Sequence, residues 1–211
     1  YTPVKDKRGY LTEWQQKPKT LHEVLKEGYA NGVGLHTGEV TKTVAIDVDK
    51  DNLSLDQIKE NFKNYFGKSL DELPNSISWT SGKTDRYQVA FEVPQEYWEK
   101  VVHCEDKPEL PEIEIRWNLH QSVLPPSYHP ETGKYTWINS PKDVPLAKAP
   151  EWFLEGWAKL SKITTKPKKR DSNDIKYKRT RDELDYDSSR VEEGLKVYCQ
   201  DHKYITYSKK P

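Results

Sequence analysis

The run VAIDVDKD constrains the fold most, because it combines the pattern of a β-strand with two carboxylates on one side of that strand. Its β-branched residues alternate with others up to Asp49, which is typical of a strand that ends in an acidic turn. Successive strand side chains point to opposite faces, so Asp47 and Asp49 share one face. The opposite face consists of Val44, Ile46 and Val48. The sequence therefore predicts a strand with the core on one side and two like charges on the other.

These two carboxylates point to a metal ion. Like charges on one face repel each other, and a divalent cation is the usual partner that makes the arrangement favourable. Hard oxygen ligands suit Mg²⁺ or Mn²⁺. A D-x-D pair at a strand end is also typical of a turn or a solvated edge, and the pair alone leaves both interpretations open.

The segment EIEIRW predicts a second acidic strand. Glu112, Glu114 and Arg116 share one face, and the bulky apolar side chains share the other. A third carboxylate beside the Asp pair would complete a site for two metal ions, which can clamp a triphosphate and activate an attacking oxygen. An amphipathic surface strand with paired charges is the alternative.

A polar loop and a strand lie between these two segments, in TSGKTDRYQVAF. A short Gly-containing loop can turn backbone N–H groups and a lysine, here Lys83, towards phosphate oxygens. Arg86 and Gln88 then share one face of the strand, so a guanidinium and an amide would point the same way. An ordinary turn and strand is the alternative interpretation.

Helices and strands alternate irregularly along the chain, which favours an α+β fold with an antiparallel or mixed sheet flanked by helices. Helical spacing occurs over residues 21–29, 54–66, 151–160 and 190–200, and strand patterns occur over residues 43–49, 76–80, 87–93 and 112–117. Two short strands are expected around a turn at residues 131–134.

Charge divides the chain into unlike parts. The 34 basic and 34 acidic side chains balance overall, but residues 1–150 carry 19 basic against 23 acidic, and the remainder carries 15 against 11. We expect a main domain over residues 1–160, a basic linker over residues 161–181, and over residues 182–211 a helical appendage or the start of a downstream module. Clustered cations such as Lys168, Lys169 and Arg170 can neutralise nucleic-acid phosphates. A solvated flexible connector is the alternative for this basic stretch.

Several protein classes are excluded by composition. No stretch approaches eighteen apolar residues and no basic-then-apolar signal opens the chain, so we expect a cytoplasmic protein with no membrane partner. Seven Trp and thirteen Tyr are too many aromatics for a disordered chain. The sequence lacks methionine and begins with Tyr1, and we expect it to be a piece of a longer protein.

Three segments in order carry a family pattern: GVGLHTGEVTKTVAIDVD, TSGKTDRYQVAF and IEIRWNLHQSVLPPSYHPETGKYTW. The third is the most specific, with an acid before Ile-Arg and then the run PPSYHPETGKYTW. Together they resemble the bifunctional primase-polymerase (Prim-Pol) domain of the archaeo-eukaryotic primase superfamily. The similarity runs from Gly32 to Trp137, and the family's preceding segment is expected at residues 7–19.

The resemblance implies that residues 1–160 are a catalytic domain with an RRM-like sheet that binds two divalent metal ions, Mg²⁺ or Mn²⁺. By position, Asp47 and Asp49 match the family's D-x-D pair and Glu114 matches its third acid. Glu112, on the same face as Glu114, is a reserve candidate.

The resemblance also implies that the second motif contacts the triphosphate of the incoming nucleotide. Gln88 stands here at a position that is usually histidine, so Arg86 on the same face is expected to take the phosphate role. The expected nucleotide-binding residues are Ser81, Lys83, Arg86, Gln88, Arg116 and His129. His36 has two interpretations, a structural role or a place on the nucleotide or template side.

The expected activity is metal-dependent, template-directed nucleotidyl transfer in a plasmid, phage or mobile-element replication protein, for primer synthesis or extension. Its expected partners are a single-stranded DNA template with a primer, nucleoside triphosphates, and a helicase domain or protein downstream. Two alternatives stay open: a catalytically weak module that binds nucleic acid, and a metal-dependent nuclease.

Overall fold

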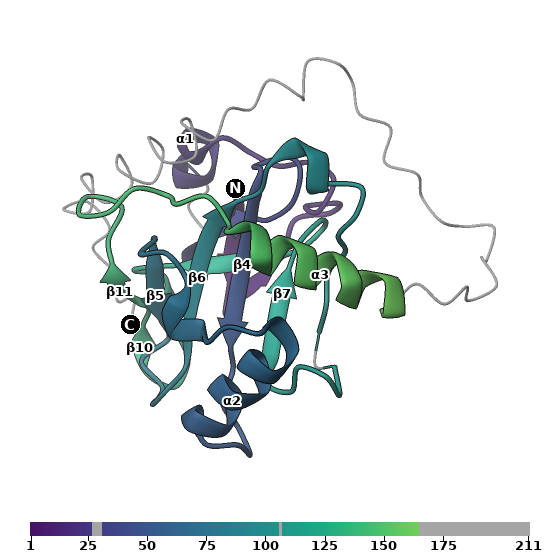
Figure 1. Cartoon of the computed structure of the whole chain (residues 1–211). Coiled ribbons are helices and arrows are strands. Elements are labelled where there is room, and N and C mark those ends of the chain that lie inside the picture. Colours follow the sequence, from purple (N-terminus) through teal and green to yellow (C-terminus); the bar gives the residue numbers. More distant parts are fainter. Residues whose placement is uncertain (27–30, 106, 165–211) are drawn as a thin grey trace.

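The structure, a computed structural model, describes residues 1–26, 31–105 and 107–164. This part of the chain is a mixed α+β unit with three antiparallel sheets and few helices (Figure 1). The strands are β1 Thr2–Lys5, β2 Arg8–Gly9, β3 Gly32–His36, β4 Thr43–Val48, β5 Ser78–Thr80, β6 Tyr87–Glu92, β7 Ile113–Arg116, β8 Gln121–Leu124, β9 Tyr128–His129, β10 Gly133–Lys134 and β11 Thr136–Asn139. The α-helices are α1 Leu21–Lys26, α2 Leu55–Phe66 and α3 Glu151–Thr164, and two 3₁₀ turns cover Leu70–Glu72 and Gln95–Tyr97.

A five-stranded sheet in the order β11-β5-β6-β4-β7 forms the centre of the fold. All pairings between its strands are antiparallel. The register places Asp47 of β4 opposite Gln88 of β6 on one side and opposite Glu114 of β7 on the other. Three polar side chains, far apart in the sequence, therefore form one row across the middle of the sheet.

The two faces of this sheet pack against different partners. Helices α2 and α3 cover one face (Figure 1), where the apolar side chains of β4, β6 and β7 join theirs in the larger core cluster. A second apolar cluster lies between the other face and the four-stranded sheet β2-β1-β3-β8. Its fully buried members include Leu35 of β3 and Trp79 of β5. The row of polar side chains lies on this second face, beyond the apolar cluster.

Several predicted elements are confirmed. Helix α2 begins after Ser54, whose side chain and that of Gln57 form a capping box, and ends at Gly67 in a left-handed conformation. The predicted face alternation of β4 and β7 is also confirmed, because one face of each strand lies in the larger core cluster, with Val44, Ile46 and Val48 from β4 and Ile113 and Ile115 from β7. Helix α3 continues to Thr164, four residues beyond the expected domain boundary.

Other predictions are incomplete or fall outside the described residues. Strands β1, β2 and β3 were not predicted, because their Gly- and Pro-containing runs lack a clear alternation. The helix expected over residues 21–29 is described as far as Lys26. The rest of the basic linker with Lys168, Lys169 and Arg170, and the helix expected over residues 190–200, lie outside the described residues. In the described ranges, no helix has the length and apolar character needed to cross a lipid bilayer.

Candidate active site

Asp47 is the centre of the candidate site. Only 8% of its surface is exposed, and its strand is flanked by partners on both sides. The Nε2 group of Gln88 donates a hydrogen bond to Asp47 Oδ2 over 3.1 Å. On the other side, Arg116 Nη2 lies 2.6 Å from the same Oδ2 atom. Asp47 is thus a buried carboxylate held between an amide and a guanidinium.

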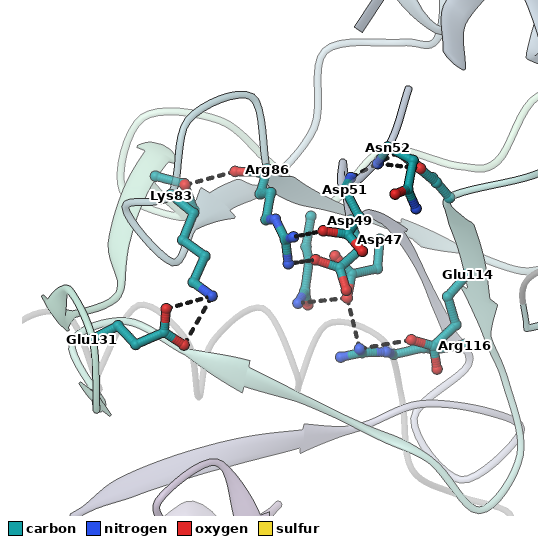
Figure 2. Close-up of polar contacts among 12 residues, drawn as sticks. Asp47, Asp49, Asp51, Asn52, Lys83, Arg86, Glu114, Arg116 and Glu131 are labelled. Carbon is teal, nitrogen blue, oxygen red and sulfur yellow. Dashed lines mark hydrogen bonds and ion pairs between the residues drawn. The ribbon is translucent and has the colours of Figure 1, made fainter. Parts of the chain in front are cut away.

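Arg116 connects this carboxylate to the third acid. Its Nη2 atom also lies 2.7 Å from Glu114 Oε2, so one nitrogen bridges two carboxylates (Figure 2). Its Nη1 atom faces the carbonyl oxygen of Gln121 at 3.3 Å. Charge-assisted contacts of this kind fix the geometry of both partners. The acids predicted from two separate motifs, Asp47 and Glu114, are therefore brought together, with Arg116 as the link between them.

The electrostatics of this group follow from its burial. Burial raises the pKa of Asp47 to about 6, against the opposing charge of Arg116. Burial alone would lower the pKa of Arg116, but the carboxylates of Asp47 and Glu114 hold it above its ordinary value. A second cation near Asp47 would stabilise its charged form further.

Asp49 lies at the rim of the same face and has a different partner. The guanidinium of Arg86 pairs with its carboxylate, and Arg86 Nη2 lies 3.5 Å from Asp51 Oδ1 (Figure 2). Asp49 and Asp51 are exposed, unlike Asp47. The sequence prediction that Asp47 and Asp49 share a face is confirmed by their common cleft, but each pairs with a different arginine.

The loop between β5 and β6 carries the next group of predicted residues. Lys83 Nζ lies 2.8 and 2.7 Å from the two carboxylate oxygens of Glu131 (Figure 2). Thr132 Oγ1 donates a hydrogen bond to the carbonyl oxygen of Ser81. These contacts attach the loop to the β9–β10 hairpin, and both Ser81 and Lys83 line the cleft.

His129 begins that hairpin turn and is almost fully buried. Its Nδ1 atom accepts hydrogen bonds from the backbone N–H groups of Glu131 and Thr132, both over 3.2 Å. An imidazole that accepts at Nδ1 carries its proton on Nε2 when neutral. Burial lowers the pKa of His129, so the neutral form is favoured. His129 lines the cleft and shapes the turn that holds Lys83.

Glu112 is not part of this group. It precedes β7 and has a left-handed backbone with φ 59°, and its carbonyl oxygen accepts a hydrogen bond from the backbone N–H of Asp49 over 3.0 Å. Its carboxylate accepts hydrogen bonds from the backbone N–H groups of Asp51, Asn52 and Leu53, over 2.8, 2.6 and 3.0 Å. Glu112 therefore holds the loop before α2, and the structure gives it a structural role in place of the reserve role expected from the sequence.

The expected catalytic and nucleotide-binding residues meet in one cleft of about 520 Å³, a size typical of small-molecule sites. They are Asp47, Asp49, Ser81, Lys83, Arg86, Gln88, Glu114, Arg116 and His129. The lining also includes Lys7 and Arg8 of the N-terminal hairpin and Trp14 after it, which were not predicted as site residues. The run Asp6-Lys7 with φ of 48° and 74° forms the turn that presents these cations. In the described part of the chain, the charged lining consists of the cations Lys7, Arg8, Lys83, Arg86 and Arg116 and the acids Asp47, Asp49 and Glu114.

The donor chemistry of the cleft fits a divalent cation. Asp47, Asp49 and Glu114 supply hard oxygen atoms, and the buried Oε1 atom of Gln88 has no hydrogen-bond partner among the described residues. No three acidic, His or Cys side chains of residues 1–26, 31–105 and 107–164 form a ligand cluster. The arginines are bound to the carboxylate oxygens that such an ion would use.

An α+β domain with acids on central strands, facing a cleft rich in Lys and Arg, has the features of a phosphate-handling enzyme. The family model described as "Bifunctional DNA primase/polymerase, N-terminal" (Prim-Pol) matches residues 2–152. The chain therefore belongs to the Prim-Pol family, as the sequence motifs predicted. Neither a search of curated proteins nor a search of solved structures found a match. Family membership implies primase or polymerase activity, with DNA and nucleotides as substrates; such enzymes are typically metal-dependent.

Proposed function

We propose that this cleft catalyses metal-dependent, template-directed nucleotidyl transfer, in which a primer 3′ hydroxyl attacks the α-phosphate of a nucleoside triphosphate. One observation carries the proposal: the strand register aligns Gln88, Asp47 and Glu114 in a row that lines the cleft. An acid row of this kind, beside several cations, suits a reaction in which both phosphate charge and a hydroxyl proton must be handled.

The cations of the cleft would bind the triphosphate. Lys83 and Arg86 come from the loop and strand of the second motif, and Lys7 and Arg8 face them from the N-terminal hairpin. Arg86 is paired with Asp49 and Lys83 with Glu131, so each is held in the cleft by an acid at its rim. A triphosphate can compete with these carboxylates for the cations, because it brings several negative charges into the cleft at once.

Asp47, Asp49 and Glu114 would hold the divalent ions, Mg²⁺ or Mn²⁺. The chemistry that such ions supply when bound is neutralisation of phosphate charge and a lower pKa for the attacking hydroxyl. Arg116 holds Asp47 and Glu114 side by side before any ion binds, which keeps two like charges together in a buried place. A bound ion would have to compete with the guanidinium for these carboxylates.

Gln88 would act as a positioning residue. Its amide nitrogen is bonded to Asp47 Oδ2, so it orients this carboxylate and leaves the phosphate role to charged neighbours such as Arg86. His129, which anchors the turn behind Lys83, would position that lysine in the same way.

The finer assignments also belong to this proposal. We infer an RRM-like catalytic domain that ends with α3 at Thr164, four residues beyond the boundary expected from the sequence. A basic linker up to residue 181, whose cations bind the template, and a helical appendage over residues 182–211 would follow it. The partners would be a primed single-stranded DNA template and a helicase downstream, in a plasmid, phage or mobile-element replication protein.

Primer extension tests the function. Asp47→Asn removes one charge from the acid row but keeps the shape of the side chain. We expect the rate of primer extension to fall by more than about 100-fold. Glu60→Gln, an exposed acid on α2 away from the cleft, is the matched control and should extend like the wild type. Equal extension by wild type and Asp47→Asn, with Mg²⁺ and with Mn²⁺, would overturn the assignment. Cleavage of labelled DNA without nucleotides would instead favour a nuclease.

A catalytically weak binding module is the second candidate. One observation favours it: the arginines already neutralise the carboxylates, and the described residues contain no preformed cluster of three metal ligands. Calorimetry with a nucleoside triphosphate and Mn²⁺ separates the two. The enzyme should bind the nucleotide more tightly with Mn²⁺ than without, whereas the binding module should show no such dependence.

A further inference from the structure

A second pocket of about 280 Å³ opens beside the cleft. Gln15 and Leu119 line both spaces, so the pocket is continuous with the site described above. The remaining lining residues are His36, Thr37, Glu39, Val40 and Asn118. We call this space the side pocket.

His36 is the unusual member of the side pocket. It is only 2% exposed, and its Nε2 atom has no hydrogen-bond partner in the described part of the chain. Its ring packs edge-on against Trp14 at 5.4 Å between centroids. Burial lowers the pKa of His36 to about 3, so the imidazole is neutral near pH 7. A buried polar atom without a partner is rare in a folded protein and suggests that a ligand supplies the missing hydrogen bond.

The walls of the side pocket are held in place by hydrogen bonds. Asn118 accepts from the backbone N–H of Glu39 over 2.9 Å and donates to the Glu39 carboxylate over 2.8 Å. Gly38, with φ 108°, makes this possible, because a Cβ atom there would lie 2.2 Å from Asn118 Oδ1. Thr37 Oγ1 donates to the carbonyl oxygen of Trp117 over 2.9 Å. The pocket is thus a formed feature of the fold.

An exposed apolar side chain stands where the side pocket meets the cleft. Leu119 is 49% exposed and has a left-handed backbone, with φ 69°. A bulky residue other than glycine seldom adopts this conformation, and such positions cluster at ligand-binding sites. Trp14 lies nearby in the lining of the cleft. Together Leu119 and Trp14 offer apolar surface on which a planar group could stack.

Charge distinguishes the two spaces. The cleft carries five Lys and Arg side chains, whereas none of the described residues that line the side pocket is Lys or Arg, and Glu39 adds a negative charge. Phosphates therefore belong in the cleft. The side pocket suits the uncharged part of the same ligand, a planar group with hydrogen-bonding edges next to apolar contacts, which describes a nucleobase.

We propose that the side pocket binds an unpaired nucleobase, with Leu119 as an apolar contact and His36 Nε2 as the hydrogen-bonding group. Trp14, which lines the adjoining cleft and packs against His36, adds apolar surface on that side. The proposal rests on the proposed function, because it takes the phosphates in the cleft to be those of a nucleic acid or nucleotide. The base could belong to the template strand or to a free nucleoside triphosphate, and the experiment distinguishes these sources.

The test is a binding measurement that needs no catalysis. A labelled primer–template is bound to the protein in fluorescence anisotropy, with an abasic site moved along the unpaired template one position at a time. If the base comes from the template, one position should weaken binding to the wild type by about tenfold, since one stacked base contributes roughly 1–3 kcal/mol. In Leu119→Ala that position should lose its effect. Ile138→Ala, an equally exposed apolar side chain on β11, is the matched control and should keep it.

The second arm uses a free nucleoside triphosphate in calorimetry. If the base belongs to the nucleotide, the abasic scan should be flat in the wild type, and Leu119→Ala should weaken nucleotide binding about tenfold while Ile138→Ala does not. His36→Phe keeps an aromatic ring against Trp14 and removes the hydrogen-bonding nitrogen. In the same calorimetry it should therefore weaken nucleotide binding, by less than Leu119→Ala does. Leu119 is exposed, so its variant tests the proposal even where His36→Phe fails to fold.

Two results separate the failure of this proposal from that of the proposed function. Identical behaviour of Leu119→Ala and wild type in both arms, or no binding of either probe to the wild type, would overturn the side pocket as a base site. A wild type that shows the base-dependent binding yet extends no primer would overturn the proposed function and leave the base site supported.

Discussion

The two faces of β4 carry opposite kinds of side chain, although both are buried. Facing α2 and α3, the apolar side chains of β4 are fully buried in the larger core cluster. Facing the cleft, Asp47 is also buried but is held by Gln88 and Arg116 through polar contacts. The apolar face gains free energy from leaving water, whereas the polar face costs free energy unless every charge has a partner. The difference shows that the apolar face stabilises the strand register. This register, in turn, places the acids of the polar face.

Among the changes to the two faces, Arg116→Leu should lower the unfolding free energy most. It leaves the buried carboxylate of Asp47 and the half-buried carboxylate of Glu114 as neighbours without their bridging cation, which costs about 3–5 kcal/mol of unfolding free energy. Urea denaturation at pH 7 measures the loss. The double variant with Asp47→Asn should recover part of it, because one of the unpaired charges is gone. A single variant as stable as the wild type would show that the pair has no energetic role.

Ile46→Ala, on the apolar face of β4, should cause the next largest loss of unfolding free energy. Ile46 is fully buried in the larger core cluster, and a large-to-small change of this kind costs about 2–5 kcal/mol. Since Ile46 does not line the cleft, primer extension should survive at temperatures where the variant remains folded. Ile138→Ala, exposed on β11, should change stability little and serves as the control. An activity loss in fully folded Ile46→Ala would contradict the separation of the two faces.

The pH dependence of stability sharpens the comparison further. Burial raises the pKa of Asp47 from 3.8 to about 6, so the folded protein binds a proton there at a higher pH than the unfolded chain does. The contribution of Asp47 to unfolding free energy therefore rises as the pH falls from about 7 to about 4, by at most about 3 kcal/mol. Denaturation of wild type and Asp47→Asn at several pH values measures this contribution as the difference between their unfolding free energies. A constant difference between the two proteins would refute it.

Lys83→Gln should have the smallest effect on stability. Its pair with Glu131 is partly exposed, and exposed pairs contribute about 0–1 kcal/mol. Nucleotide affinity should nevertheless fall several-fold, because the variant removes a cation from the cleft. Lys59→Gln on α2 is the control, because it breaks a comparable pair, with Asp71 of the 3₁₀ turn that follows. It should leave nucleotide affinity unchanged. Equal affinities of the two variants would remove Lys83 from the site.

Much of the fold was predictable because local rules govern it. The capping box at Ser54, the alternation of β4 and the spacing of α3 each depend on residues a few positions apart. Strands β2 and β3 were missed for the converse reason: their glycines serve close approaches, and Gly34 lies against the side chain of Gln121 in β8. Such a requirement has no local signature.

The candidate site divides in the same way. Alternation along single strands was enough to place Asp47 with Asp49, and Glu114 with Arg116, on common faces. The cations of the N-terminal hairpin were missed, although the pair Lys7-Arg8 after a turn residue was a signal that could have been followed. Glu112 was misjudged because its left-handed backbone, with φ 59°, turns its carboxylate towards the loop before α2.

The sequence by itself determined the class of fold, the acids and their strand faces, and the family, because side-chain alternation and motif spacing are properties of neighbouring residues. Only the tertiary structure decided that Arg116 bridges Asp47 and Glu114, that the N-terminal hairpin closes the cleft, and that His36 is left with an unpartnered nitrogen beside Leu119. These arrangements join segments that are far apart along the chain. They depend on strand register and on the packing of two sheets, which the free energy of the whole fold selects.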